Sequence, residues 1–332
     1  MPVTYSILHR TLYKYRKPVT FGEHRMLFRP RESHDLRVLA TDLKVSPAAA
    51  IRLMLDSHSN SIALVQPLIA DTELEIVSSF TIEQALTDAE LPISHAARHF
   101  PFAYSTNERI DLEHYLRPHH DDPQGVLTAW ARQFLRTDGP TETREMLLTM
   151  NQCIKDTLHY RVRHEEGTQD PLMTLQSGTG TCRDFAFLMM EALRHLGIAT
   201  RFVSGYLYDP ALDGGGSGMV GSGSTHAWLQ AYLPGAGWVA FDPTNNLLGG
   251  SQLIRVAMAR HPRQAAPVSG SWFGRPGAYL GMEVDVKIAR KQATFAPTVA
   301  APDKVSAFEV CSSTSHGDTA GSGSGTQAGA AS

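Results

Sequence analysis

Cys182 is the residue of this chain whose surroundings most favour chemistry. A glycine-containing segment at 177–181 precedes it, and the segment 185–196 after it carries apolar residues at helical spacing, up to Gly197. We therefore expect a buried helix with Cys182 in its first turn. The unpaired N–H groups and the dipole of a helix N-terminus stabilise anions, including a thiolate and an acyl oxyanion. The pattern predicts a nucleophilic thiol, and the alternative is a cysteine that only fills space in a core.

Two glycines just before the cysteine favour the nucleophile over the packing role. Gly178 and Gly180 have no Cβ, so we expect room beside Cys182 for another backbone or for a substrate. Asp184 follows in the first turn, where an acidic side chain supports the start of a helix.

A reactive thiol needs a base, and the base needs a group that orients it. Among fifteen histidines, His226 is the best candidate, because it begins an apolar strand directly after the glycine-rich segment 213–224. Asp242 ends the following strand, which returns after a turn at 234–237. We expect one ring nitrogen of His226 within roughly 3 to 4 Å of the Cys182 sulfur and the other at the Asp242 carboxylate.

The pairing of these two strands leaves the contact between His226 and Asp242 open. If Leu233 faces Trp238 across the turn, Asp242 faces Leu229, which lies three positions from His226. A bulge or a different turn register is then needed to join the pair. Taken singly, His226 could be a histidine at the end of an exposed loop, and Asp242 an aspartate that begins a turn.

Four segments resemble a known family when they are taken in order. They are Gly180-Thr181-Cys182-Arg183-Asp184-Phe185-Ala186, Arg201-Phe202-Val203-Ser204-Gly205-Tyr206, His226-Ala227-Trp228 and Gly237-Trp238-Val239-Ala240-Phe241-Asp242-Pro243-Thr244-Asn245. Together they resemble the bacterial transglutaminase-like proteins, within the papain-like cysteine enzyme superfamily, over most of residues 150–250. The resemblance implies a triad in which Cys182 is the nucleophile, His226 the base and Asp242 the orienting residue. The segment 213–224 departs from the family by being longer and richer in glycine, which affects the expected shape of the cleft.

The resemblance also implies a reaction. The thiolate attacks a carboxamide or peptide carbonyl and forms a thioester, which water or an amine then resolves. Water gives protease or amidase activity and a lysine-type amine gives transglutaminase activity, and the sequence does not distinguish the two. The implied partner is a protein or peptide substrate. The alternative from another class is a non-catalytic protein- or peptide-binding module on the same fold.

Strand patterns dominate the first hundred residues. Apolar runs at 51–55 and 62–65 flank the polar cluster 56–61, which predicts a hairpin. Short strands at this spacing predict a small β-sandwich. Helical spacing begins at about residue 126, and a second helix carries its apolar stripe on Met146, Leu147, Met150, Ile154 and Leu158.

These patterns, with the resemblance, predict an α+β protein. We expect an antiparallel β-sandwich-like domain at residues 1–105 and a helical linker region at 106–145. A papain-like, transglutaminase-like core follows at 146–250, in which the helix that carries Cys182 packs on an antiparallel sheet. The final parts are a C-terminal strand extension at 251–291, and a tail at 292–332 whose Ala, Pro, Ser, Gly and Thr content predicts disorder.

Composition excludes several classes of protein. The 332 residues are 42% hydrophobic and 19% charged, and 30 basic residues balance 33 acidic ones. This net charge of −3 gives no electrostatic footprint for nucleic acid or an anionic membrane. Neither an apolar run of about 20 residues nor a secretory signal is evident. Three scattered cysteines do not form a disulfide framework, so we expect a cytoplasmic protein.

The remaining candidate residues carry less weight. The cluster at 119–122, His-His-Asp-Asp, has metal-ligating residue types, but adjacent residues do not converge on one ion without a special loop, so we expect neither a metal nor a cofactor. Trp228 and Trp238 could line a cleft, although aromatic residues on a hairpin are more often cross-strand pairs. Cys153 and Cys311 have no evident activating partner.

Overall fold

The first part of the chain forms strands in which buried and exposed residues alternate. The computed structural model describes residues 2–85, 92–163, 167–213, 218–221, 223–250 and 252–291. Buried and more exposed residues alternate along much of the first strand, and every second residue of the sixth is buried from Leu74 to Gln84. The strands of this region are β1 (Val3–Phe21), β2 (His24–Met26), β3 (Leu36–Ser46), β4 (Ala49–Leu55), β5 (Ser61–Pro67) and β6 (Asp71–Gln84). The predicted hairpin is confirmed, because β4 and β5 pair antiparallel.

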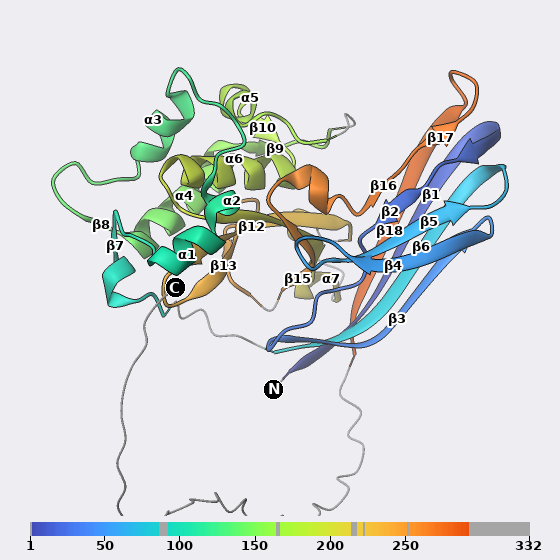
Figure 1. The fold of residues 1–332 in the computed structure, drawn as a ribbon, viewed down its shortest axis with the longest axis horizontal. Coiled ribbons are helices and arrows are strands. Elements are labelled where there is room, and N and C mark those ends of the chain that lie inside the picture. The colour runs from blue at the N-terminus through green and yellow to red at the C-terminus, as the bar shows by residue number, and fades with distance from the viewer. Residues whose placement is uncertain are drawn as a thin grey trace, which may run out of the picture. The chain divides into compact units, whose positions relative to one another are not determined.

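Two antiparallel sheets form the predicted sandwich. One has the order β17-β1-β6-β3 with β18 also paired to β1, and the other has the order β16-β2-β5-β4. Tyr15, Phe21 and Ile76 from the first sheet share an apolar core with Met26 and Val65 from the second. Figure 1 shows these strands at the right of the view.

The last described strands return to this sandwich. They are β16 (Val268–Ser269), β17 (Trp272–Phe273) and β18 (Tyr279–Lys291). The strand β18 runs antiparallel along most of β1, from the Thr4–Lys291 pair to the Tyr15–Tyr279 pair. Of the expected C-terminal extension, β15 (Leu253–Ala259) instead joins the core sheet. The tail predicted at 292–332 lies outside the described residues.

Helices occupy the middle of the chain. They are α1 (Thr106–Asp111), α2 (Glu113–Leu116), α3 (Val126–Arg132), α4 (Thr143–Thr157), α5 (Pro171–Ser177), α6 (Cys182–His195) and α7 (Pro210–Asp213), with short 3-10 turns η1 (His95–Ala97) and η2 (Pro262–Ala265). The short strands β7 (His99–Phe100), β8 (Thr141–Glu142), β9 (His159–Tyr160) and β10 (Thr179–Gly180) connect them. In α4 the predicted stripe is buried from Met146 to Ile154. Among the described residues, no helix is both long and apolar enough to cross a membrane.

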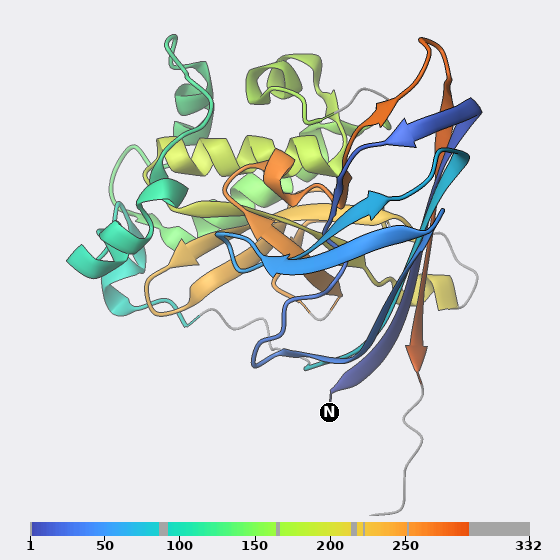
Figure 2. The same ribbon diagram turned by 45° about the vertical axis from the view of Figure 1, so that its right-hand side comes forward.

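The core contains a five-stranded antiparallel sheet, against which α6 packs. Its order is β14-β13-β12-β11-β15, with β11 at Thr200–Leu207, β12 at Thr225–Leu233, β13 at Gly237–Asp242 and β14 at Leu247–Leu248. The helix α6 lies across one face, where Phe185 and Leu188 pack with Leu229 and Phe241 (Figure 2). The fold is therefore α+β, as predicted, with its cysteine-bearing helix on an antiparallel sheet.

The core sheet also packs against the sandwich, at the end of β11 and the start of β15. Tyr206 and Ile254 of the core sheet share an apolar cluster with Ile7 and Phe80 of the sandwich. Inside this interface the hydroxyl of Tyr206 lies 2.7 Å from Nδ1 of His9. The sandwich and the core thus form one compact unit with a continuous interior.

Candidate active site

Cys182 is the first residue of α6, as the sequence predicts, and it is buried, with 7% of its surface exposed. The preceding Thr181 is extended and supplies the N-cap position. Asp184 accepts hydrogen bonds from the backbone N–H of Thr181 at 2.8 Å and from its hydroxyl at 2.9 Å. This arrangement fixes the first turn and aims the free N–H groups of the helix at the cysteine.

Asp184 ties this helix start to the chain before it. Arg163 donates two hydrogen bonds to the carboxylate, at 3.0 and 3.1 Å, and the backbone N–H of Gln169 donates a third at 2.6 Å. Burial alone would raise the pKa of Asp184, but these donors hold it below its ordinary value. Asp184 is therefore a buried anion with a structural role, and the sequence did not reveal Arg163 as its partner.

The two glycines before Cys182 act differently from our expectation. Gly178 ends α5 in the left-handed conformation, with φ +64°. A Cβ on Gly180 would lie 2.9 Å from the Asp184 Cβ and 3.0 Å from the Phe185 ring. The first turn of α6 thus fills the space beside Gly180, where we expected another backbone or a substrate, whereas a Cβ on Gly178 would meet nothing within 4 Å.

A turn register that differs from the assumed one joins His226 to Asp242. Leu233 pairs with Gly237, and Leu229 with Phe241, so Asp242 lies opposite Trp228. His226 is two residues from Trp228 and therefore on the same face of the sheet. The carboxylate is a diagonal neighbour of the imidazole, and no bulge is needed.

The contact between the two side chains is short and fully buried. Nε2 of His226 lies 2.8 Å from Oδ2 of Asp242, and neither side chain has exposed surface. Asp242 also accepts hydrogen bonds from the Thr244 backbone N–H at 2.9 Å and from Nδ2 of Asn245 at 2.9 Å. The second half of the expected geometry, a ring nitrogen at the Asp242 carboxylate, is confirmed.

This contact favours the charged forms of both His226 and Asp242. Burial by itself lowers the pKa of His226, but the charge and hydrogen bond of Asp242, with a further contribution from Cys182, raise it to about 10. Burial would raise the pKa of Asp242, and His226, Asn245 and Thr244 lower it instead. The pair is therefore an imidazolium and a carboxylate at neutral pH.

Nδ1 is the ring nitrogen that remains for the thiol. Asp242 occupies Nε2. Nδ1 is buried, and no described residue contacts it with the full geometry of a hydrogen bond. Cys182 nevertheless acts on the imidazole, since its side chain adds to the raised pKa of His226. The structure thus brings the three predicted residues together, with the Cys182–His226 contact looser than the His226–Asp242 hydrogen bond. Contacts between a nucleophile and its base are often long in proteins without substrate.

Part of the glycine-rich segment lies over the imidazole. A Cβ on Gly221 would be 2.5 Å from Nδ1 of His226, and Gly221 has φ +92°, so only glycine fits there. The neighbouring Val220 exchanges two hydrogen bonds of 3.0 Å with the side-chain amide of Asn245. Among the described residues of this segment, Met219 and Val220 are held by hydrogen bonds to the side chains of Asp209 and Asn245. The positions 214–217 and 222 lie outside the described residues.

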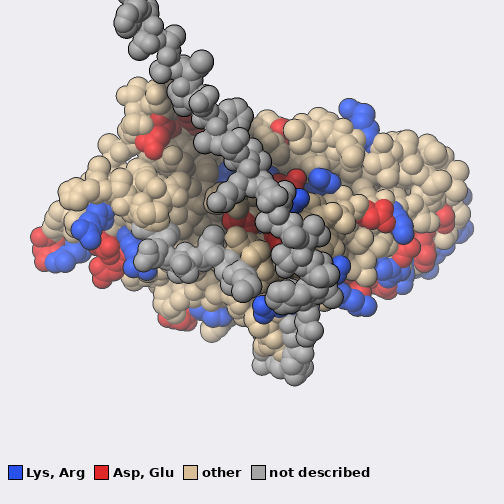
Figure 3. Space-filling model, turned by 90° about the horizontal axis from the view of Figure 1, so that it is seen from below, with Lys and Arg blue, Asp and Glu red and all other residues tan. Residues whose placement is uncertain are grey.

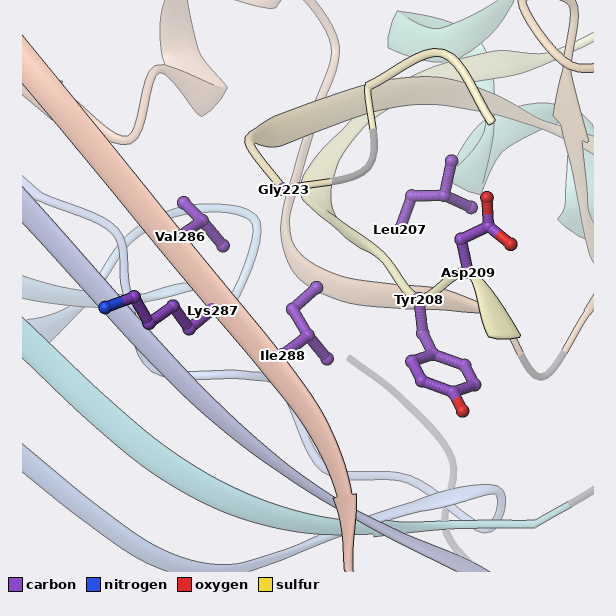
Figure 4. Close-up of a pocket in the computed structure, with 7 residues that line it drawn as sticks. All are labelled: Leu207, Tyr208, Asp209, Gly223, Val286, Lys287 and Ile288. Atoms are coloured by element: carbon purple, nitrogen blue, oxygen red, sulfur yellow. The ribbon is translucent and has the colours of Figure 1, made fainter. Parts of the chain in front are cut away.

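The same segment borders a cavity of about 190 Å³ between β18 and the end of β11. Figure 4 shows Val286 and Ile288 on one side and Leu207, Asp209 and Gly223 on the other. None of the triad residues lines it, so the cavity is separate from the thiol.

The other candidate residues have structural surroundings. The backbone N–H groups of His119 and His120 both donate to Glu191 at 2.7 Å, and the described residues contain no group of three side chains that could hold a metal. Trp228 is buried and stacks with His226 at 6.1 Å between ring centroids. Trp238 is opposite Tyr232 across the hairpin, as expected of a cross-strand pair. Cys153 is half-buried on α4, and Cys311 lies outside the described residues.

Fold and site together define a class of protein. A helix that begins at a cysteine and packs on an antiparallel sheet with a buried His–Asp pair is the architecture of the papain-like, transglutaminase-like proteins. The model of the transglutaminase-like superfamily matches residues 128–243, and that of the bacterial transglutaminase-like N-terminal region matches residues 5–83. The chain belongs to the bacterial transglutaminase-like proteins.

Several known proteins are similar to the chain. Uncharacterised proteins of Mycobacterium leprae and Mycobacterium tuberculosis are each 28% identical, over 84% and 85% of this chain and 97% and 92% of their own length. A protein-glutamine gamma-glutamyltransferase of Pseudomonas aeruginosa is 26% identical over 62% of this chain and 28% of that protein. The solved structure of a candidate cysteine protease from Cytophaga hutchinsonii has a TM-score of 0.66 at 19% identity, over 90% of this chain and 93% of the other, which shows a shared fold.

Proposed function

We propose that this protein is a thiol-dependent enzyme that acts on amide groups through a thioester, with Cys182, His226 and Asp242 as its triad. The observation that carries the proposal is the buried His226–Asp242 contact of 2.8 Å, which leaves Nδ1 as the ring nitrogen that can serve Cys182. The pKa of His226 is raised to about 10, so the ring holds a proton at neutral pH. A charged imidazolium beside a sulfur favours the thiolate, which is the nucleophilic form.

The proposed reaction balances as follows. The proton of the Cys182 thiol is held on Nδ1 of His226, and the thiolate sulfur bonds to the carbonyl carbon of a carboxamide or peptide. The oxygen of that carbonyl gains negative charge at the N-terminus of α6, where free N–H groups stabilise it. The amine leaves with the proton from the imidazolium, and a thioester remains. Water or a second amine then gives a proton to Nδ1 and attacks the thioester, which yields a carboxylic acid or a new amide and restores the thiolate and the imidazolium.

Asp242 supports this cycle without exchanging a proton. It accepts three hydrogen bonds, from His226, Asn245 and Thr244, so its negative charge is well stabilised. That charge fixes the ring with Nδ1 directed away from the carboxylate and stabilises the imidazolium. The proposed substrate is a protein or peptide with an accessible amide or glutamine carboxamide.

Labelling with an electrophile tests the proposal. A peptide electrophile and an electrophilic glutamine mimic should each modify Cys182, and peptide mass spectrometry locates the label. Cys182→Ser should abolish labelling at this position, and Cys153→Ser, the matched control on the surface of α4, should leave it unchanged. Peptide substrates with a fluorescent primary amine then separate the two outcomes, since transfer incorporates the amine and hydrolysis releases an acid. A Cys182 that labels no faster than Cys153 would favour the non-catalytic binding module.

A further inference from the structure

Asn245 makes more contacts with the triad and its surroundings than its place after a turn requires. Its Nδ2 donates to Oδ2 of Asp242 at 2.9 Å, the same oxygen that contacts His226. The other proton of Nδ2 is donated to the carbonyl of Val220 at 3.0 Å, and Oδ1 accepts the Val220 N–H at 3.0 Å. Every donor of this amide and its oxygen are thus used, and only one orientation of the amide satisfies them.

This amide joins two parts of the chain that meet at the imidazole. On one side it holds the carboxylate that contacts Nε2 of His226. On the other side it pairs with Val220 as a second strand would, directly before Gly221, whose backbone lies over the Nδ1 side of the ring. Asp209 accepts the N–H of Met219 and holds the same segment at its other end.

We propose that Asn245 is a positioning residue, which acts through Asp242 and the backbone of 219–221 to hold the imidazole of His226 in a dry, fixed orientation. The inference rests on the proposed function, because it assigns a role within that triad. The carboxylate has two oxygens, and Asn245 with Thr244 keeps Oδ2 turned toward Nε2. The clamped segment excludes water from the ring, which strengthens the contact between the opposite charges.

A double-mutant cycle tests this role by the rate at which iodoacetamide modifies Cys182 at pH 7, followed by mass spectrometry of the Cys182 peptide. Asn245→Ala should lower the rate roughly tenfold, and Asp242→Asn should lower it at least as much. Because Asn245 acts partly through Asp242, adding Asn245→Ala to Asp242→Asn should lower the rate by clearly less than the roughly tenfold that Asn245→Ala causes alone. Asn246→Gly is the matched control, because Asn246 is left-handed, contacts Gln152 and Asn151, and has no contact with the triad.

The outcomes separate the inference from the proposed function. A Cys182 rate that depends on His226, with fully additive effects of Asn245→Ala and Asp242→Asn, would overturn the role of Asn245 alone. A Cys182 rate that does not respond to His226→Ala would contradict the triad and the positioning role together. If Asn245→Ala does not fold, Asn245→Leu gives the same test, since it nearly keeps the size of the side chain, adds no charge and has no proton to donate to Asp242.

Discussion

The imidazole of His226 is the residue on which the proposed chemistry depends. Its pKa is raised to about 10 although burial alone would lower it, because Asp242 and Cys182 both favour the charged ring. At neutral pH the ring can therefore hold the proton that the thiol gives up. In this state the histidine is both the base that has acted and the acid that will protonate the leaving amine.

The sequence predicts the members of the triad at residue scale, but not the groups that hold them. Cys182, His226 and Asp242 are recognisable because their types and their order match a known pattern of segments. Asn245 stands within one of those segments, but its partner Val220 lies 25 residues earlier in a glycine-rich stretch without a strand or helix pattern. Arg163, which pairs with Asp184, is likewise in a segment with no periodicity that could place it.

At the scale of elements, the length of the turn between β12 and β13 determines whether Asp242 and His226 lie on the same face of the sheet. A four-residue connection would place Asp242 opposite Leu229 and on the other face of the sheet from His226. The observed three-residue connection, from Leu233 to Gly237, shifts the pairing by one position and brings Asp242 to the same face. Sequence spacing alone does not choose between these two turns, because both accommodate the glycines at 235 and 237.

The start of α6 depends on Asp184, which gives a prediction at this scale. Asp184→Ala removes the bonds to Thr181 and leaves Arg163 without its carboxylate. We expect a loss of about 3 kcal/mol or more in the free energy of unfolding, measured by urea denaturation. Arg183→Ala, one position earlier, should change it by less than about 0.5 kcal/mol. Equal effects of the two substitutions would contradict the assigned role of Asp184.

At the scale of the whole molecule, the sandwich and the core depend on contacts between distant parts of the chain, which local sequence patterns do not predict. Most strands of the sandwich are predictable from local alternation, but the pairing of β18 with β1 links residues that are 264 to 287 positions apart in the sequence, from Tyr15–Tyr279 to Thr4–Lys291. Nothing local distinguishes β18, which returns to the sandwich, from β15, which joins the core sheet.

On the face shown in Figure 3, acidic and basic side chains are interspersed. A protein or peptide substrate, the absence of nucleic-acid and membrane partners, and a cytoplasmic location stay predictions.

His9, at the interface between the sandwich and the core, should make the free energy of unfolding depend on pH. Burial lowers the pKa of His9 to about 4, although Asp285 opposes the shift, so the folded protein keeps it neutral beside Tyr206. In the unfolded chain it takes up a proton near pH 6.5. Its contribution to the free energy of unfolding should therefore be complete above pH 6.5 and fall by up to about 1.4 kcal/mol per pH unit between pH 6.5 and 4. His9→Gln should flatten this dependence in urea unfolding, and His34→Gln, at an exposed histidine, should not. A slope unchanged by His9→Gln would show that other groups cause it.

The rate at which iodoacetamide modifies Cys182 across pH 5 to 10, in the native sequence and in His226→Ala, tests the central claim most directly. If the buried imidazolium stabilises the thiolate, the rate in the native sequence should already be high at pH 6 and change little up to pH 9. In His226→Ala the rate should be low at pH 6 and rise with the titration of an ordinary thiol near pH 8.5. Two profiles that coincide would contradict the account, because Cys182 would then gain nothing from His226 and Asp242.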